Sequence, residues 1–148
     1  GKEVTSYARN DIAELPLVLF DKKEIISFYD YEIDREEIRR VLDEDKNRLL
    51  QESRVVKYIK RNQYLEAYMK YMENIAEPLV RAARLLYTPR HYGYGLCHIS
   101  HHLPAETVRE LEPFYQVASL EEIEENLPKA AGMFAEYERR VREKYRLT

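Results

Sequence analysis

Residues 63–87, QYLEAYMKYMENIAEPLVRAARLLY, decide the fold. Apolar residues recur through this stretch at spacings of three and four, as they do along one face of an α-helix. Pro78 has no backbone N–H, so we expect a kink at that point, and we expect Thr88-Pro89 to end the helix. The face expected to be buried comprises Leu65, Tyr68, Met72, Ile75, Leu79, Ala83 and Leu86.

A second helix is expected before this stretch. Asp34 and Glu37 have the spacing of a capping box, which marks a helix N-terminus. From Ile38 to Ile59 the apolar residues again follow a helical stripe, with a break expected near Ser53. The acidic run at residues 43–45 points in several directions on such a helix, so we expect it to face solvent.

Three more helices are expected after residues 63–87. Residues 96–102 favour a short helix, and residues 104–111 favour another with a proline in its first turn. Ser119 and Glu122 form a capping box that begins the last helix, which we expect to be interrupted or restarted at Pro128. The apolar stripe of this last helix comprises Leu120, Ile123, Leu127, Ala130, Phe134, Tyr137, Val141 and Tyr145.

The N-terminal segment favours β structure instead. Two apolar, β-favouring runs at residues 15–20 and 24–29 flank a short polar turn, which predicts a β-hairpin over residues 15–32. Because an isolated hairpin is marginal in water, it must pack on the helices or extend a sheet. The predicted architecture is mainly α, with a β-hairpin segment at 1–33 and a compact helical bundle at 34–148.

Composition limits the class of protein. Of 148 residues, 45% are hydrophobic and 34% are charged, which is typical of one folded domain and not of a disordered chain. The longest apolar run, Leu17–Phe20, is far shorter than the roughly 20 residues of a membrane span. Cys97 is the single cysteine, so no intrachain disulfide forms and a reducing cytoplasm is the expected location. Because the chain begins at Gly1 and not at Met, we expect it to be cut from a longer protein.

Charge is distributed unevenly. The formal net charge of −3 argues against general nucleic-acid binding. Residues 54–102 nevertheless hold eight Lys/Arg against three acids, together with all four histidines. Arg81 and Arg84 on the helix and Arg90-His91 after it suit a phosphate, because guanidinium groups match its geometry, and Lys57, Lys60 and Arg61 could converge with them. The alternative is a solvated basic face that complements the acidic helices.

The histidines allow two interpretations. His98, His101 and His102 share one face if their segment is helical, and imidazoles so placed could ligate Zn²⁺ in a hydrolase. Alternatively, one histidine caps the glycine-rich turn and the others are exposed. Arg84 and His91 also fit the loose Arg-x(4–6)-His pattern of HEPN ribonucleases, which makes a HEPN-like ribonuclease an alternative function.

Two tyrosines belong to the glycine-rich turn of residues 92–95. Tyr92 and Tyr94 flank Gly93, and aromatic rings beside glycine can stack on a base. The alternative is that each ring is buried to anchor the turn.

Four motifs in the second half of the chain show a family resemblance. They are RLLYTP at 84–89, YGYGL at 92–96, HHLP at 101–104, and Leu, Phe-Tyr, Val and Ser-Leu-Glu within 111–121. With them, the stretch 79–137 resembles the C-terminal helical domain of nucleotidyltransferase-domain proteins of the DNA polymerase beta-like superfamily. In that family an N-terminal domain binds two Mg²⁺ and NTP with a Gly-Ser sequence that is followed by an Asp-x-Asp pair, and no such combined motif occurs here.

The resemblance implies a helical substrate-binding or accessory domain that binds a nucleotide or another phosphate-bearing ligand. Such a domain is not catalytically complete alone, so Mg²⁺ would enter only with carboxylates from a partner catalytic domain, and the hairpin would be the tail of that domain's sheet. Alternatives are the two enzymes above and a structural interaction module, and a homodimer is left open. The candidate ligand-binding residues are Arg84, Arg90, His91, Tyr92, Tyr94 and His101, of which Arg84, Tyr92, Tyr94 and His101, with Pro104, match the family's motif as cleft or structural positions.

Overall fold

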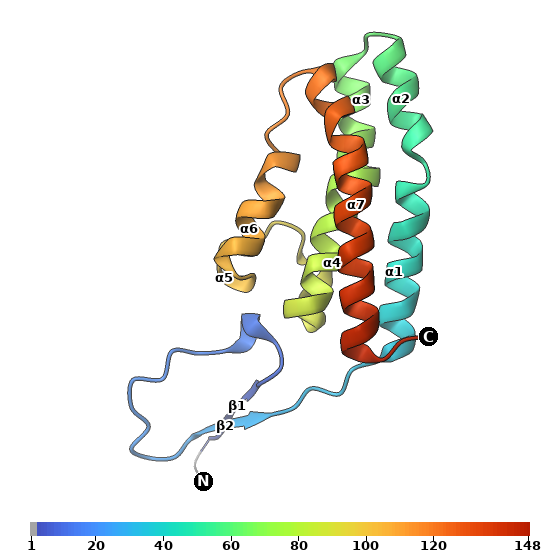
Figure 1. The fold of residues 1–148 in the computed structure, drawn as a ribbon. Coiled ribbons are helices and arrows are strands. Elements are labelled where there is room, and N and C mark those ends of the chain that lie inside the picture. The colour runs from blue at the N-terminus through green and yellow to red at the C-terminus, as the bar shows by residue number, and fades with distance from the viewer. Residues whose placement is uncertain (1–2) are drawn as a thin grey trace.

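The protein is described by a computed structural model over residues 3–148; Gly1 and Lys2, and the expectation attached to Gly1, lie outside the described residues. It is mainly α-helical, as predicted, with a small sheet at the N-terminal end (Figure 1). The strands and helices are β1 (Thr5–Ala8), β2 (Ile26–Tyr29), α1 (Arg35–Leu49), α2 (Glu52–Lys60), α3 (Tyr64–Tyr71), α4 (Glu77–Tyr87), α5 (Ile99–His102), α6 (Ala105–Leu111) and α7 (Leu120–Tyr145). Short 3-10 turns cover Ile12–Glu14, Pro89–Tyr94 and Glu112–Phe114, and a π-helical segment covers Met72–Ala76.

The core forms where α1, α4 and α7 pack against one another (Figure 1). The expected stripe of α7 is confirmed: from Ile123 to Tyr145 each of its members is buried, and only Leu120 at the helix start is partly exposed. Burying each large apolar side chain stabilises the fold by about 1.5–3 kcal/mol, so this interface accounts for much of the bundle's stability.

Both predicted capping boxes place the helix starts correctly. The Asp34 carboxylate accepts a hydrogen bond from the Glu37 N–H at 3.1 Å, and the Ser119 hydroxyl oxygen accepts one from the Glu122 N–H at 3.1 Å. Each bond satisfies an N–H that has no partner within its helix. The break between α1 and α2 falls at residues 50–51, just before the expected position.

The helix expected over residues 63–87 is interrupted. Its predicted buried face is confirmed from Ile75 onward but is wrong before that residue. The π-helical segment Met72–Ala76 separates α3 from α4 and ends just before Pro78, which lacks the N–H that a regular turn requires. A π turn holds one extra residue, so it shifts the buried face by one position. Before the shift, Ala67 and Tyr71 are fully buried, whereas Leu65 is 75% exposed.

The expected interruption at Pro128 is wrong. The helix α7 runs through Pro128 without a break. Leu127 and Ala130 beside it are buried in the core, so packing on the bundle outweighs the loss of one backbone hydrogen bond.

The predicted hairpin is also wrong, although its second run does form β2. The partner of β2 is β1, which lies earlier in the chain and pairs in parallel, with Thr5 opposite Ile26. The run at residues 15–20 is part of a long loop between the strands (Figure 1). The Asp21 carboxylate ends this loop by accepting hydrogen bonds from the N–H groups of Ile25 and Ile26. One edge of β2 is therefore paired with β1, and not with the run at residues 15–20.

None of the helices within residues 3–148 combines the length and apolar character needed to cross a membrane.

Candidate functional site

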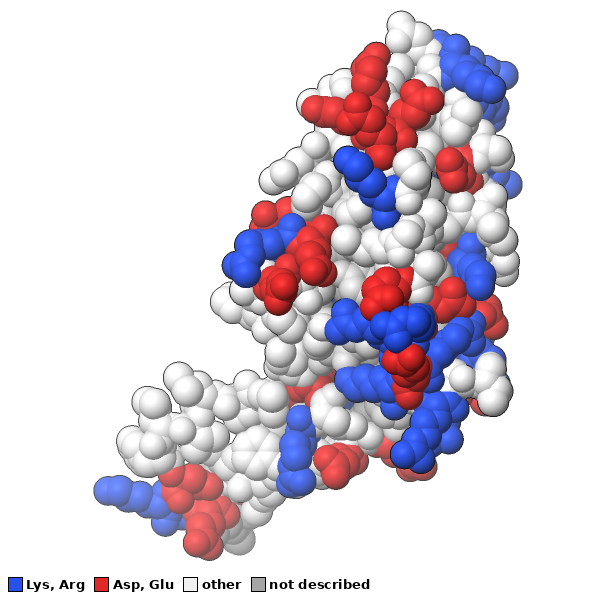
Figure 2. Space-filling model, viewed as in Figure 1, with Lys and Arg blue, Asp and Glu red and all other residues white. Residues whose placement is uncertain are grey.

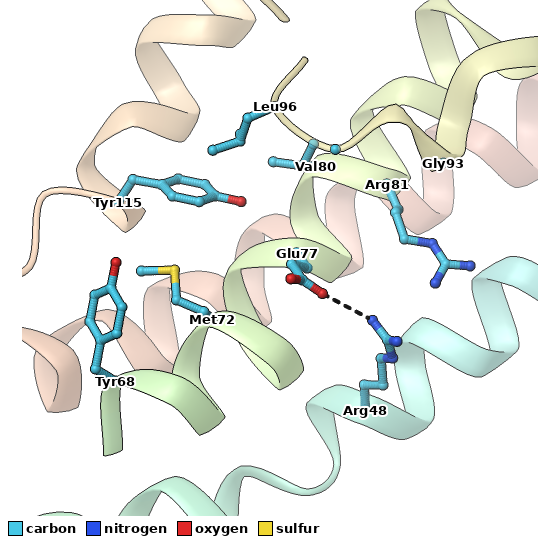
Figure 3. Close-up of a pocket in the computed structure, with 10 residues that line it drawn as sticks. Arg48, Tyr68, Met72, Glu77, Val80, Arg81, Gly93, Leu96 and Tyr115 are labelled. Atoms are coloured by element: carbon cyan, nitrogen blue, oxygen red, sulfur yellow. Dashed lines mark ion pairs between the residues drawn. The ribbon is translucent and has the colours of Figure 1, made fainter. Parts of the chain in front are cut away.

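A pocket of about 550 Å³ opens beside α1, α4 and the turn that follows α4 (Figure 3). This volume lies within the range of small-molecule sites. The pocket is lined by Arg48, Tyr68, Met72, Glu77, Val80, Arg81, Gly93, Gly95, Leu96 and Tyr115.

One half of the pocket is apolar and aromatic. Tyr68, Met72, Leu96 and Tyr115 gather there in Figure 3, away from the charged side chains. Tyr68 is 37% exposed and Leu96 is 51% exposed, so both surfaces are open to a ligand. Burial raises the pKa of the Tyr115 hydroxyl, which therefore remains a hydrogen-bond donor at neutral pH. This half can accommodate a flat apolar group.

The other half is charged. Arg48 from α1 forms an ion pair with Glu77 of α4 at 3.6 Å (Figure 3), and Arg81 of α4 pairs with Glu44 of α1 at 3.3 Å. Arg48 also approaches the Glu73 carbonyl oxygen, at 3.5 Å. All these distances exceed those of strong charge-assisted hydrogen bonds. The two guanidinium groups are therefore held in place without being saturated.

Asp45 lies behind the two arginines. It is completely buried, so the expectation that the acidic run faces solvent is wrong for Asp45, although it is confirmed for Asp43 and Glu44, which are exposed. Its carboxylate lies 3.3 Å from Arg81 Nε and 4.0 Å from Arg48 Nη1, yet neither oxygen accepts a hydrogen bond. Burial raises the pKa of Asp45 to about 7, against the opposing attraction of Arg81 and Arg48.

Arg84 shapes the wall of the pocket from inside. It is completely buried and donates hydrogen bonds to the carbonyl oxygens of Gly95 and Cys97, each at 2.8 Å, and to His102 Nδ1 at 3.0 Å. Gly95 and Leu96 line the pocket, so Arg84 is a positioning residue for that wall. It lies inside the fold and not on the surface where we expected it to face an anionic ligand.

Asp11, which the sequence analysis did not identify, joins the N-terminal segment to the bundle. Its carboxylate is completely buried and accepts hydrogen bonds from Thr88 Oγ1 at 2.8 Å and the Arg90 N–H at 3.0 Å. His91 Nδ1 lies 3.4 Å from the same carboxylate. We call Asp11, Thr88, Arg90 and His91 the clasp.

The Arg90 side chain extends the clasp. Its guanidinium lies 2.7 Å from the Glu14 carboxylate, donates to the Tyr29 hydroxyl at 2.6 Å, and stacks over the Tyr31 ring. All three partners belong to the N-terminal segment. Arg90 and His91 thus contact the protein's own N-terminal segment. In the HEPN-like pattern, Arg84 bonds to Gly95, Cys97 and His102, whereas His91 lies beside Asp11.

The two tyrosines of the turn differ in their surroundings. Tyr92 donates from its hydroxyl to Glu37 at 2.7 Å and lies beneath Arg81, so it anchors the turn to α1 and α4. Tyr94 is 53% exposed and packs edge-on against the His91 ring, with 4.8 Å between centroids. Tyr94 is thus the one of the pair with a free surface.

The histidines gather only in part. The ring of His102 lies 5.9 Å from that of His98 and 6.2 Å from that of His91, whereas His101 is exposed on α5. Across residues 3–148, no three His, Cys, Asp or Glu side chains are placed to hold a metal ion. Burial, and then the neighbouring Arg84, lower the pKa of His102, so its neutral form is favoured.

In the charged half of the pocket, Arg81 belongs to the basic group expected to bind a phosphate, whereas Arg48 was not expected there. Arg48 and Arg81 lie far apart in the chain and meet only because α1 packs on α4. One signal was present: Asp45 falls on the same helical stripe as Val41 and Leu42, where a charged residue must be buried.

Comparisons with known proteins leave this pocket as the main guide to function. No family model, curated protein or solved structure matches the chain.

Proposed function

We propose that this chain is the helical substrate-binding or accessory domain of a nucleotidyltransferase-like protein. Its pocket takes an anionic ligand with a flat apolar part, such as a nucleotide. The observation that supports this best is the division of the pocket into an aromatic half and a half with two unsaturated guanidinium groups.

The charged half suits an anion because its arginines can exchange partners. Arg48 has three neighbouring oxygen groups, all at 3.5 Å or more, and a phosphate would offer shorter contacts. Tyr68 and Tyr115 in the other half offer rings against which a base or another flat group can pack.

Catalysis in this proposal requires a second domain. Nucleotidyl transfer by two metal ions needs closely spaced carboxylates that bridge the metals and the phosphates. We assign those carboxylates, and with them Mg²⁺, to a partner catalytic domain.

The test is a calorimetric titration of the protein with ADP at low ionic strength. The double variant Arg48→Gln/Arg81→Gln should bind ADP at least roughly tenfold more weakly, because each charge-assisted contact contributes about 1.5–3 kcal/mol. Arg109→Gln, on the exposed face of α6, is the matched control and should leave binding unchanged. Circular dichroism confirms that each variant is folded.

Equal affinity of the wild type and the folded double variant for ADP would contradict the proposal. Titration with adenosine and with inorganic phosphate separates the two halves: each should bind more weakly than ADP if both halves contribute.

A second candidate function, an interaction module, is favoured by the loop between β1 and β2. Leu17, Leu19 and Phe20 are 87%, 81% and 76% exposed there, and Figure 2 shows an uncharged area beside a group of acidic and basic side chains at this end of the molecule. Exposed apolar groups of this kind mark contact surfaces. The nearby two-stranded sheet has free edges, to which a strand of a partner domain could add.

Analytical ultracentrifugation tests this second candidate. If the loop contacts a second copy of the chain, the wild type should self-associate, and Leu17→Ser/Leu19→Ser/Phe20→Ser should be a monomer. A wild type that is monomeric at all concentrations would show that this surface does not bind a second copy of the chain. An interaction module would then need a different partner.

A further inference from the structure

We infer that the pocket binds its anion together with a proton, and that Asp45 is the residue that takes up this proton. The inference rests on the proposed function, because it requires an anion at Arg48 and Arg81.

The starting point is the environment of Asp45. Its side chain has no contact with solvent, and neither carboxylate oxygen accepts a hydrogen bond. The two arginines beside it provide the only charge compensation among the described contacts. The same two arginines line the pocket. Asp45 and a bound anion would therefore share one pair of cations.

Among the described residues, four charged groups from α1 and α4 act on Asp45. Arg48 and Glu44 belong to α1, and Arg81 and Glu77 belong to α4. The side chains of Glu44 and Glu77 are 48% and 57% exposed, so water solvates their charges. Asp45 has no such solvation, and it is the carboxylate most sensitive to a change in nearby charge.

Anion binding changes that charge in a defined direction. A phosphate oxygen at Arg48 and Arg81 adds negative charge near Asp45 and draws both guanidinium groups toward the pocket. Both effects disfavour the ionised carboxylate. A proton from solvent then binds one Asp45 oxygen, which removes one negative charge from the buried cluster.

The resting state of Asp45 makes this uptake measurable near neutral pH. Burial raises the pKa of Asp45 to about 7, so above that pH most molecules of the free protein have an ionised Asp45. The anion raises the pKa further. At about one pH unit above neutrality, we expect an uptake of roughly half a proton or more per anion bound.

The experiment is a titration of the folded protein with ADP at pH 8, in two buffers of low and high ionisation enthalpy. The difference in binding heat between the buffers gives the number of protons taken up. Asp45→Asn should bind ADP with an uptake close to zero, and its affinity should vary much less between pH 6.5 and 8.5. Glu77→Gln, which removes an exposed carboxylate beside the same arginines, should retain the uptake.

The outcomes separate the two proposals. Binding with no proton uptake in the wild type, or with the same uptake in Asp45→Asn, would overturn the role of Asp45 and leave the proposed function intact. An absence of ADP binding by the wild type would overturn both. Uptake lost in Glu77→Gln but retained in Asp45→Asn would assign the proton to Glu77 and overturn the inference.

Discussion

Arg84 Nη1 donates a hydrogen bond to His102 Nδ1 at 3.0 Å, and this bond joins the core helix α4 to the short helix α5. Arginine has no acceptor, so Nδ1 must carry the lone pair and His102 must be neutral in this arrangement. With the bonds from Arg84 to the Gly95 and Cys97 carbonyl oxygens, it holds the pocket wall in one conformation.

Replacing Arg84 should therefore destabilise the fold. Arg84→Met removes a buried guanidinium that donates to two carbonyl oxygens and to His102 Nδ1, and we expect it to lower the free energy of unfolding by about 3 kcal/mol. Urea denaturation measures this effect. The exposed Arg109→Met should change stability by less than about 0.5 kcal/mol. A similarly small effect at Arg84 would show that the wall does not depend on it.

The same pair predicts a pH effect. The pKa of His102 is lowered from 6.5 in the folded state, mainly by burial and then by Arg84, so the unfolded chain binds a proton more readily. The contribution of His102 to stability is present above pH 6.5 and should be lost as the pH falls through its lower folded-state pKa. His102→Gln, which keeps an acceptor but does not titrate, should lose less stability than the wild type in this range. Chemical denaturation at several pH values measures both, and identical profiles would contradict the prediction.

Asp45 should act in the opposite direction. Its folded-state pKa of about 7 lies above the unfolded value of 3.8. The contribution of Asp45 to stability is therefore greatest below pH 3.8 and falls as the pH rises toward 7. Asp45→Asn resembles the protonated form, so its stability advantage over the wild type should already be present at pH 5 and should grow by about 2–3 kcal/mol between pH 5 and pH 8.5. Thermal unfolding at the two pH values measures the difference. Asp43→Asn, on an exposed side chain of the same helix, should show no such change.

The clasp should control the attachment of the N-terminal segment. Asp11→Asn places an amide N–H₂ where the carboxylate accepts hydrogen bonds from Thr88 and Arg90. We expect the free energy that holds the N-terminal segment on the bundle to fall by about 3 kcal/mol. The loop between β1 and β2 should then be cleaved faster by a protease at native conditions, while the circular dichroism of the bundle is retained. Asp30→Asn, which is exposed on the same segment, is the control. Unchanged cleavage in Asp11→Asn would show that the clasp does not hold the segment.

Local patterns predicted the helices well where each helix packs along one continuous face. The α7 stripe and the Asp34 and Ser119 caps depend on residues within a few positions of one another, so the sequence contains the whole signal. The buried face predicted for residues 63–87 is displaced at Met72–Ala76, because a π turn shifts that face by one position. Apart from Pro78, such a turn has no clear sequence signature.

By itself, the sequence of this protein determined the mainly helical class, the positions of the long helices and the concentration of cations and histidines in the middle of the chain. Only the tertiary structure decided what those side chains contact. Arg84 is buried, Arg90 and His91 bind the N-terminal segment, and Arg48 meets Arg81 over the buried Asp45. The reason is physical: helix periodicity is set by neighbours in the chain, whereas the partners of a charged side chain are set by packing between distant segments and by the exclusion of water.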